Sequence, residues 1–212
     1  MASARRPYKG ASADERRSER RRRLLTAGRE LWGDHGWAAV TMRGVCARAN
    51  LNDRYFYESF PDVEALLLAV YDEALQELVA RTERAMTEAP ATPEAQLRAV
   101  IGAFVHTLAD DPRGARIGLV DPAGSAALEQ RRRATYHVCA ELSLAAVKPY
   151  LRPGADERKL RWDALFSLGG LGELVLTWLT GSLEATAEEI VEHLVTVVLR
   201  VGIPHLRELR ET

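Results

Sequence analysis

The sequence of 212 residues contains few cysteines and no long uninterrupted apolar run. Its two cysteines, Cys46 and Cys139, are far apart and lack the paired spacing of a zinc site, which disfavours a disulfide framework or a bound metal. The least polar stretch, residues 164–183, holds Glu173 and four glycines, so a membrane span is not expected. The arginine-rich N-terminus lacks the apolar segment of a secretory signal. These absences favour a globular, cytoplasmic protein.

The formal net charge of −1 conceals two parts of opposite sign. Residues 1–60 hold 13 Lys and Arg against 7 Asp and Glu, whereas residues 61–212 hold 16 against 23. A basic N-terminal module on an acidic body indicates a polyanionic partner. For the arginine run at residues 16–23, a solvated helix face and a nucleic-acid contact remain equally open.

Helical periodicity dominates the chain, and no sustained alternation of polar and apolar residues marks strands, so the predicted fold is all-α. Capping patterns set several helix starts: Ser12 with Glu15, Thr41, Asn52, and Thr186 with Glu189. The predicted helices span residues 13–35, 42–49, 53–59, 62–88, 93–110, 124–148, 155–181 and 186–202, with a short element at 113–120.

Two of these helices are short and are separated only by Asn50 and Leu51. Their apolar residues can form a small shared core, and asparagine tolerates the positive φ that so tight a turn needs. This arrangement predicts a helix-turn-helix unit. The N-terminal residues of its second helix, which begins after Asn52, would enter a major groove of DNA.

Residues 24–68 resemble the DNA-binding domain of the tetracycline-repressor (TetR) family. The resemblance lies in the stretches LWGDHGWAAVTM, RGVCARANL and NDRYFYESFPDVEALL. It implies that two residues at the start of the first short helix contact the DNA backbone, that one residue caps the second helix, that the next three residues face bases, and that a tyrosine contacts phosphate. The candidate DNA-binding residues are, in that order, Thr41 and Arg43, then Asn52, Asp53, Arg54 and Tyr55, then Tyr57.

Three positions depart from the family pattern. Asn50 replaces the usual glycine, Asn52 the usual serine or threonine, and Val63 a phosphate-binding lysine. The last change removes a cation and weakens the expected salt dependence of DNA binding by roughly one phosphate equivalent. Asp53 could accept from a cytosine amine, but a favourable interaction with the helix dipole is the preferred interpretation.

The last two predicted helices are more apolar than a solvated surface allows, so we expect them to pack against a second copy in a two-fold dimer. A dimer of this kind reads a pseudo-palindromic operator. The expected interface residues are Leu165, Leu168, Gly172, Leu176, Leu179, Leu194, Val197, Val198 and Val201. For the glycines at 169, 170 and 172, close packing is favoured over space for a ligand.

The resemblance also implies that the C-terminal domain binds a small effector, which moves the helix linking the two domains. Candidate lining residues form an aromatic set with a few polar atoms, suited to a mostly apolar molecule: Phe104, Tyr136, Cys139, Trp162, Phe166, Glu173 and Trp178. The aromatic members are more often plain core, and Glu173 fits a salt bridge at a rim equally well.

The sequence therefore predicts a disordered basic arm at residues 1–13, a helix-turn-helix DNA-binding domain at 14–61 and an effector-binding and dimerisation domain at 62–212. The predicted function is that of a homodimeric transcription regulator, a repressor released from its operator by the effector. The alternative is a dimeric ligand-binding or interaction module without DNA binding, which the missing lysine at Val63 favours. An enzyme is not expected, because the histidines are scattered and no catalytic constellation, cofactor motif or metal cluster is evident.

Overall fold

The structure is a computed structural model that describes residues 12–120 and 125–206. Over these residues the secondary structure is helical, apart from one isolated antiparallel bridge between Leu151 and Leu206. They fall into two compact units, one ending at Val70 and the other beginning at Tyr71. The all-α prediction is confirmed. The predicted arm lies outside the described residues up to position 11, and Ser12 and Ala13 already form the cap and first residue of a helix.

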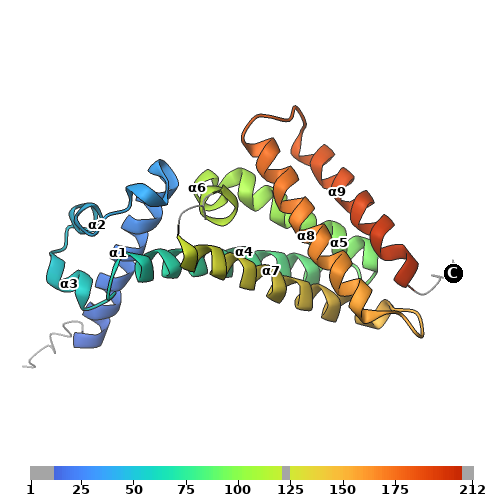
Figure 1. Cartoon of the computed structure of the whole chain (residues 1–212), viewed down its shortest axis with the longest axis horizontal. Coiled ribbons are helices and arrows are strands. Elements are labelled where there is room, and N and C mark those ends of the chain that lie inside the picture. The colour runs from blue at the N-terminus through green and yellow to red at the C-terminus, as the bar shows by residue number, and fades with distance from the viewer. Residues whose placement is uncertain (1–11, 121–124, 207–212) are drawn as a thin grey trace, which may run out of the picture. The chain divides into compact units, whose positions relative to one another are not determined.

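The first unit is built from α1 (Ala13–His35), a 3-10 turn η1 (Trp37–Ala39), α2 (Met42–Ala49), α3 (Asp53–Tyr57) and the start of α4 (Val63–Glu88) (Figure 1). Reciprocal hydrogen bonds between Ser12 and Glu15 start α1, as predicted from their spacing. The helix stops at Gly36, whose φ of 84° is accessible to glycine at little cost, and whose N–H donates to the carbonyl of Trp32.

The core of the first unit gathers large side chains from each of its helices. The fully buried ones are Leu24, Trp32, Val45, Phe56, Leu66 and Val70. Burying each such side chain contributes roughly 1.5–3 kcal/mol. The start of α4 belongs to this core, because the Cα of Gly28 on α1 lies so close that an added Cβ would stand 3.2 Å from Leu66 and 3.3 Å from Val70. The compact unit therefore extends nine residues past the boundary expected at residue 61.

The second unit contains the rest of α4 and the helices that follow it. These are α5 (Pro93–Asp110), α6 (Pro112–Ala115), a π-helical turn η2 (Arg116–Val120), α7 (Ala126–Val147), η3 (Lys148–Tyr150), α8 (Glu157–Leu179), α9 (Ala187–Gly202) and η4 (Ile203–His205). Most predicted helix ends fall within about two residues of these bounds. The agreement follows from side-chain caps such as Thr92 on α5 and the Thr186–Glu189 capping box on α9.

Helices α5, α8 and α9 enclose the main core of the second unit, and α7 packs along α8. Buried members of this core include Ile101 and Val105 of α5, Val175 of α8, and Leu194 and Val195 of α9. Among the helices of the described residues, none combines the length and the apolar character that crossing a bilayer requires.

Candidate functional site

Helices α2 and α3 form a helix-turn-helix whose geometry is fixed by local side-chain hydrogen bonds. Thr41 Oγ1 accepts from the backbone N–H of Gly44 at 3.1 Å, and Asn52 Oδ1 accepts from that of Tyr55 at 3.3 Å. Asn50 occupies the left-handed region (φ 50°, ψ 52°) between the helices, so the asparagine makes the turn in place of a glycine. The second helix of the motif is short, ending at Tyr57 rather than near Ser59.

The side chains predicted to contact DNA lie on the outer surface of this motif. Thr41, Arg43, Asn52, Asp53 and Arg54 are exposed, and Tyr57 is 59% exposed. Within the described part of the chain Arg43 has no ion-pair partner, so its charge is available to an external anion. Tyr55 is half-buried instead, because the guanidinium of Arg20 stacks 4.5 Å from the centre of its ring.

Glu58 joins the outer face of α3 to α1. Its Oε1 accepts from Nε of Arg54 at 3.0 Å, and its Oε2 lies 3.5 Å from Nη2 of Arg20. The Arg54 side chain is nevertheless 83% exposed. The residue predicted to read a base is therefore oriented by a carboxylate, while its other donors bond to none of the residues that the structure describes.

The arginine run of α1 binds the C-terminal ends of both short helices. Arg17 donates to the Glu58 carbonyl at 3.1 Å and Arg21 to the Ser59 carbonyl at 2.8 Å, after the last turn of α3. Arg23 donates to the carbonyls of Ala49 and Asn50 at the end of α2. Cations are favoured at such ends by unpaired carbonyls and the helix dipole.

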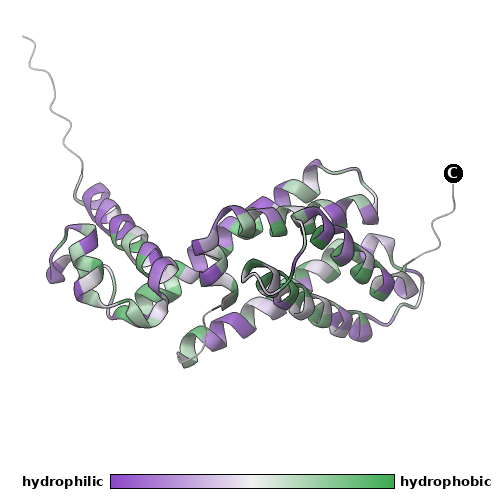
Figure 2. Ribbon diagram, turned by 90° about the horizontal axis from the view of Figure 1, so that it is seen from above, coloured by the Kyte–Doolittle hydropathy of each residue, from purple (hydrophilic) through white to green (hydrophobic). Residues whose placement is uncertain are grey.

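These contacts refine both sequence interpretations of residues 16–23, which form the hydrophilic first turns of α1 seen in purple beside the grey N-terminal trace (Figure 2). Part of the run is neither a plain solvated face nor free for nucleic acid, since Arg17, Arg21 and Arg23 are held by backbone carbonyls. Sequence patterns could not reveal this because backbone carbonyls carry no sequence signature.

The second unit holds a cavity of about 330 Å³ between η2, α7 and α8. Its lining combines leucine side chains, two glycines and three polar groups: Leu119, Arg132, Tyr136, Leu165, Gly169, Gly172, Glu173 and Leu176. The Tyr136 hydroxyl lies against the backbone of Gly172, where an added Cβ would stand 3.1 Å from it. Gly172 therefore serves close packing, as expected, whereas Cβ atoms at Gly169 and Gly170 would meet nothing within 4 Å.

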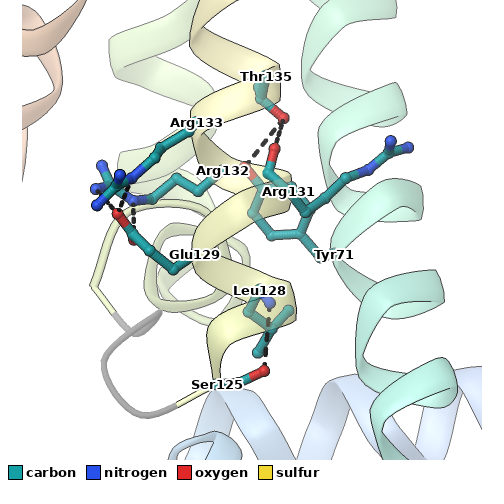
Figure 3. A network of polar contacts seen from close by, with 8 residues as sticks. All are labelled: Tyr71, Ser125, Leu128, Glu129, Arg131, Arg132, Arg133 and Thr135. Carbon is teal, nitrogen blue, oxygen red and sulfur yellow. Dashed lines mark hydrogen bonds and ion pairs between the residues drawn. The ribbon is translucent and has the colours of Figure 1, made fainter.

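A cluster of opposite charges borders this cavity at the start of α7 (Figure 3). Glu129 accepts from Nε and Nη2 of Arg132 at 3.0 and 3.2 Å, and from Nε of Arg133 at 2.7 Å. Hydrogen bonds from these two guanidiniums lower the pKa of Glu129 to about 2. The guanidinium of Arg132 also lies 5.4 Å from the ring centre of Tyr136. The cluster keeps one net positive charge, and Arg132 is its only member in the cavity lining.

The same segment of α7 is attached to α4. Nε of Arg131 donates to Asp72 Oδ1 at 2.6 Å, and the Tyr71 hydroxyl donates to Thr135 Oγ1 at 3.3 Å. Figure 3 shows Thr135 in turn donating to the carbonyl of Arg131. Burial raises the pKa of Tyr71, which keeps its hydroxyl protonated and able to donate. Along α7, Arg132 and Tyr136 thus line the cavity, whereas Arg131 and Thr135 contact α4.

Residues 24–70 match the family model described as "Bacterial regulatory proteins, tetR family". This segment is a TetR-family domain. The curated relatives of the chain include the HTH-type transcriptional activator FasR and the HTH-type transcriptional repressor KstR, both of Mycolicibacterium smegmatis. FasR is 31% identical over 48% of this chain and 46% of its own length, and KstR is 31% identical over 46% and 48%. The chain thus matches about half the length of these relatives.

The fold around the TetR-family domain is also shared. The transcriptional regulator FadR of Bacillus subtilis, solved in complex with stearoyl-CoA, superposes with a TM-score of 0.69 at 17% identity. The match covers 84% of this chain and 96% of that one. The similarity therefore extends from the TetR-family domain through the helices of the second unit.

Outside the TetR-family domain, the structure separates the predicted ligand-lining residues. Tyr136 and Glu173 line the cavity. Phe104 and Trp178 pack against the α5–α8–α9 core instead, and Trp178 Nε1 donates to the carbonyl of Ala185 at 2.7 Å.

Three other predicted ligand-lining residues do not line the cavity. Cys139 is half-buried on α7, and burial raises the pKa of its thiol. Trp162 and Phe166 are 55% and 71% exposed on the outer face of α8, where Arg158 lies over the Trp162 ring. Sequence reasoning missed Arg132, for which the only signal was the arginine run after Glu129.

The expected dimer residues are likewise divided. Leu194 was misplaced, because it is only 4% exposed and packs in the core of its own chain. Leu165, Gly172 and Leu176 line the cavity, and Leu179 and Val198 pack against the core. Leu168, Val197 and Val201 are half-buried. The large apolar side chains exposed on α7 and α8 are others: Val138, Leu142, Trp162 and Phe166.

Proposed function

We propose that this protein is a sequence-specific DNA-binding regulator of transcription. The observation that carries the proposal is the exposed, preformed α3, whose Arg54 is oriented by Glu58 and whose end is held by the arginines of α1. A helix presented in this way suits the major groove. The match of residues 24–70 to the TetR family and the names of FasR and KstR support the same function.

The proposed regulator responds to a small effector bound in the cavity of the second unit. The B. subtilis FadR structure with stearoyl-CoA supports ligand binding by a protein of this fold. The cavity is less apolar than the sequence suggested, because Arg132, Tyr136 and Glu173 share it with the leucines. The effector is proposed to act through α4, which leaves the first unit at Val70 and is attached to α7 by Tyr71 and Asp72.

We further propose that two copies associate through the exposed face of α8. Trp162 and Phe166 lie one turn apart on this face, next to the exposed Gly169 and Gly170. Large apolar side chains beside glycines allow close approach of a second helix. Two-fold symmetry predicts a pseudo-palindromic operator. We propose that the protein acts in the cytoplasm. We also propose that it represses transcription; of the two relatives, FasR is named as an activator and KstR as a repressor.

The test is selection of bound duplexes from a random DNA pool by the purified protein, followed by affinity measurements at two salt concentrations. We expect enrichment of an inverted repeat and a steep loss of affinity with salt. In the same assay Arg54→Ala should lose about 1–3 kcal/mol and relax specificity at one position. The control Arg22→Ala removes the same charge from an exposed pair with Glu19. Failure to enrich any sequence would favour the module without DNA binding.

A further inference from the structure

We infer that the cavity of the second unit recognises a small organic acid, whose carboxylate binds Arg132 in exchange for Glu129. The inference rests on the proposed effector function and names the chemical class of the ligand. Two observations support it. Two arginines bond to the single carboxylate of Glu129, and of these two Arg132 lines the cavity.

Two guanidiniums share the one carboxylate of Glu129. Arg133 donates to it at 2.7 Å from an exposed position, whereas Arg132 reaches into the cavity lining. If Arg132 turned to another anion, Glu129 would keep its bond to Arg133 and would not be left unpaired. The exchange therefore avoids the usual penalty of breaking a charge pair.

Arg132 is also prepared to hold a planar anion. Its guanidinium has donors beyond the two used by Glu129, and the ring of Tyr136 limits its movement. A guanidinium and a carboxylate can form two parallel hydrogen bonds, which gives this pair both strength and geometric selectivity. The leucine walls formed by Leu119, Leu165 and Leu176 would cover the apolar body of such an acid.

A cationic ligand is the opposite possibility, since Glu173 also lines the cavity. Within the described residues its carboxylate has no ion-pair partner, but it is exposed. Ion pairs formed in contact with solvent contribute little, so Glu173 is a weak anchor beside the half-buried Arg132. Its charge at the rim would instead disfavour ligands with a second anionic group, such as phosphate esters.

The test uses isothermal titration calorimetry on the full chain with hexanoate, octanoate and decanoate as probes. Each acid is compared with the alcohol and the amine of the same chain length. We expect at least one acid to bind about tenfold or more tightly than its alcohol and its amine. Equal binding of acid and alcohol throughout the series, or tighter binding of the amines, would overturn the inference.

Three variants assign the binding to the proposed exchange. Arg132→Gln should reduce acid binding to the level of the alcohol. Arg133→Gln takes away the second partner of Glu129, so it should weaken acid binding to a smaller extent and keep part of the preference for the acid. Glu129→Gln removes the competing carboxylate and should tighten acid binding roughly three- to tenfold. A gain of this kind cannot arise from misfolding. Weaker acid binding by a folded Glu129→Gln protein, or equal losses in the two arginine variants, would contradict the exchange.

The ligand-binding test and the DNA-selection test can fail independently of each other. If acid binding depends on Arg132 but no DNA sequence is enriched, the ligand class is supported and the proposed role in transcription is rejected. Enriched DNA with no preference for the acid would do the reverse.

Discussion

Nε of Arg54 lies 3.0 Å from Oε1 of Glu58, four residues along the chain, so the residue predicted to read a base carries its own counter-charge. Glu58→Gln should free Arg54 and remove a negative charge from the DNA-facing surface. We expect affinity for random duplexes to rise roughly two- to tenfold and the salt dependence to steepen by about one charge. Preference for the selected sequence should fall, because Arg54 loses its orientation. Fluorescence anisotropy at several salt concentrations measures all three.

Glu19→Gln is the control for that experiment, since among the described residues Glu19 is hydrogen-bonded to the exposed Arg22 and not to Arg54. It makes the same change in charge without touching Arg54. An equal effect of both variants would mean that Glu58 acts through charge alone.

Arg23 should stabilise the first unit far more than its neighbour Arg22. Arg23 donates to the carbonyls that end α2, whereas the side chain of Arg22 forms an exposed pair with Glu19. We expect Arg23→Ala to cost about 1.5–3 kcal/mol, as for hydrogen bonds from a charged group. Arg22→Ala should cost less than about 1 kcal/mol. Urea unfolding of the two variants gives the comparison, and similar midpoints would argue against the capping role of Arg23.

Gly28 should not tolerate a methyl group. The Cβ of Gly28→Ala would stand 3.2 Å from Leu66 and 3.3 Å from Val70, and because both side chains are fully buried they would have to shift against the core. The expected strain of about 1–3 kcal/mol exceeds the helix propensity gained, which is about 1 kcal/mol. Gly102→Ala is the matched change in an open helical position and should stabilise the protein. The unfolding temperature of each variant is the measurement. A higher unfolding temperature for both variants would show that α1 and α4 can separate locally.

The contacts between α7 and α4 should carry the effector response. Asp72→Asn breaks the pair with Arg131, and Tyr71→Phe removes the hydrogen bond to Thr135. We expect the double variant to bind ligand and DNA as before, but with a smaller change in DNA affinity when ligand is added. The measurement is DNA anisotropy with and without ligand.

Glu141→Gln provides the control for coupling, because it removes an exposed pair between α7 and Arg161 of α8. An unchanged ligand response in the double variant, or the same loss in the control, would place the coupling elsewhere.

The exposed face of α8 should determine the oligomeric state. Phe166→Glu puts a charge at the most exposed aromatic side chain of that helix and should shift a dimer toward the monomer. Leu142→Glu makes the same change on the neighbouring helix α7. Analytical ultracentrifugation at several protein concentrations distinguishes the two. A dimer that survives Phe166→Glu would exclude the proposed interface.

The sequence predicted the helix positions well because polar caps mark their ends. Ser12, Thr41 and Asn52 each accept the hydrogen bond expected from their position. The turn at Asn50 was predictable for a similar reason, since few residues adopt its backbone conformation.

The orientation of α8 was not predictable. The helix carries apolar residues on most of its circumference, so periodicity does not tell which side meets the core. Phe166 was expected at the ligand and is on the surface, whereas Leu165 was expected at the dimer interface and lines the cavity. The distinction depends on tertiary packing against α7 and α9.

Adjacent residues of α8 therefore lie in different environments. Leu165 lines the cavity and Phe166 faces out, while Val175 is buried in the core and Leu176 returns to the cavity. A single substitution in α8 can thus change the fit of the ligand, the exposed surface or the stability of the core without changing the other two, although the positions are adjacent in sequence. Inserting or deleting one residue would rotate everything beyond it by about 100° and exchange all three environments at once. The length of α8 is consequently far less free to vary than its composition.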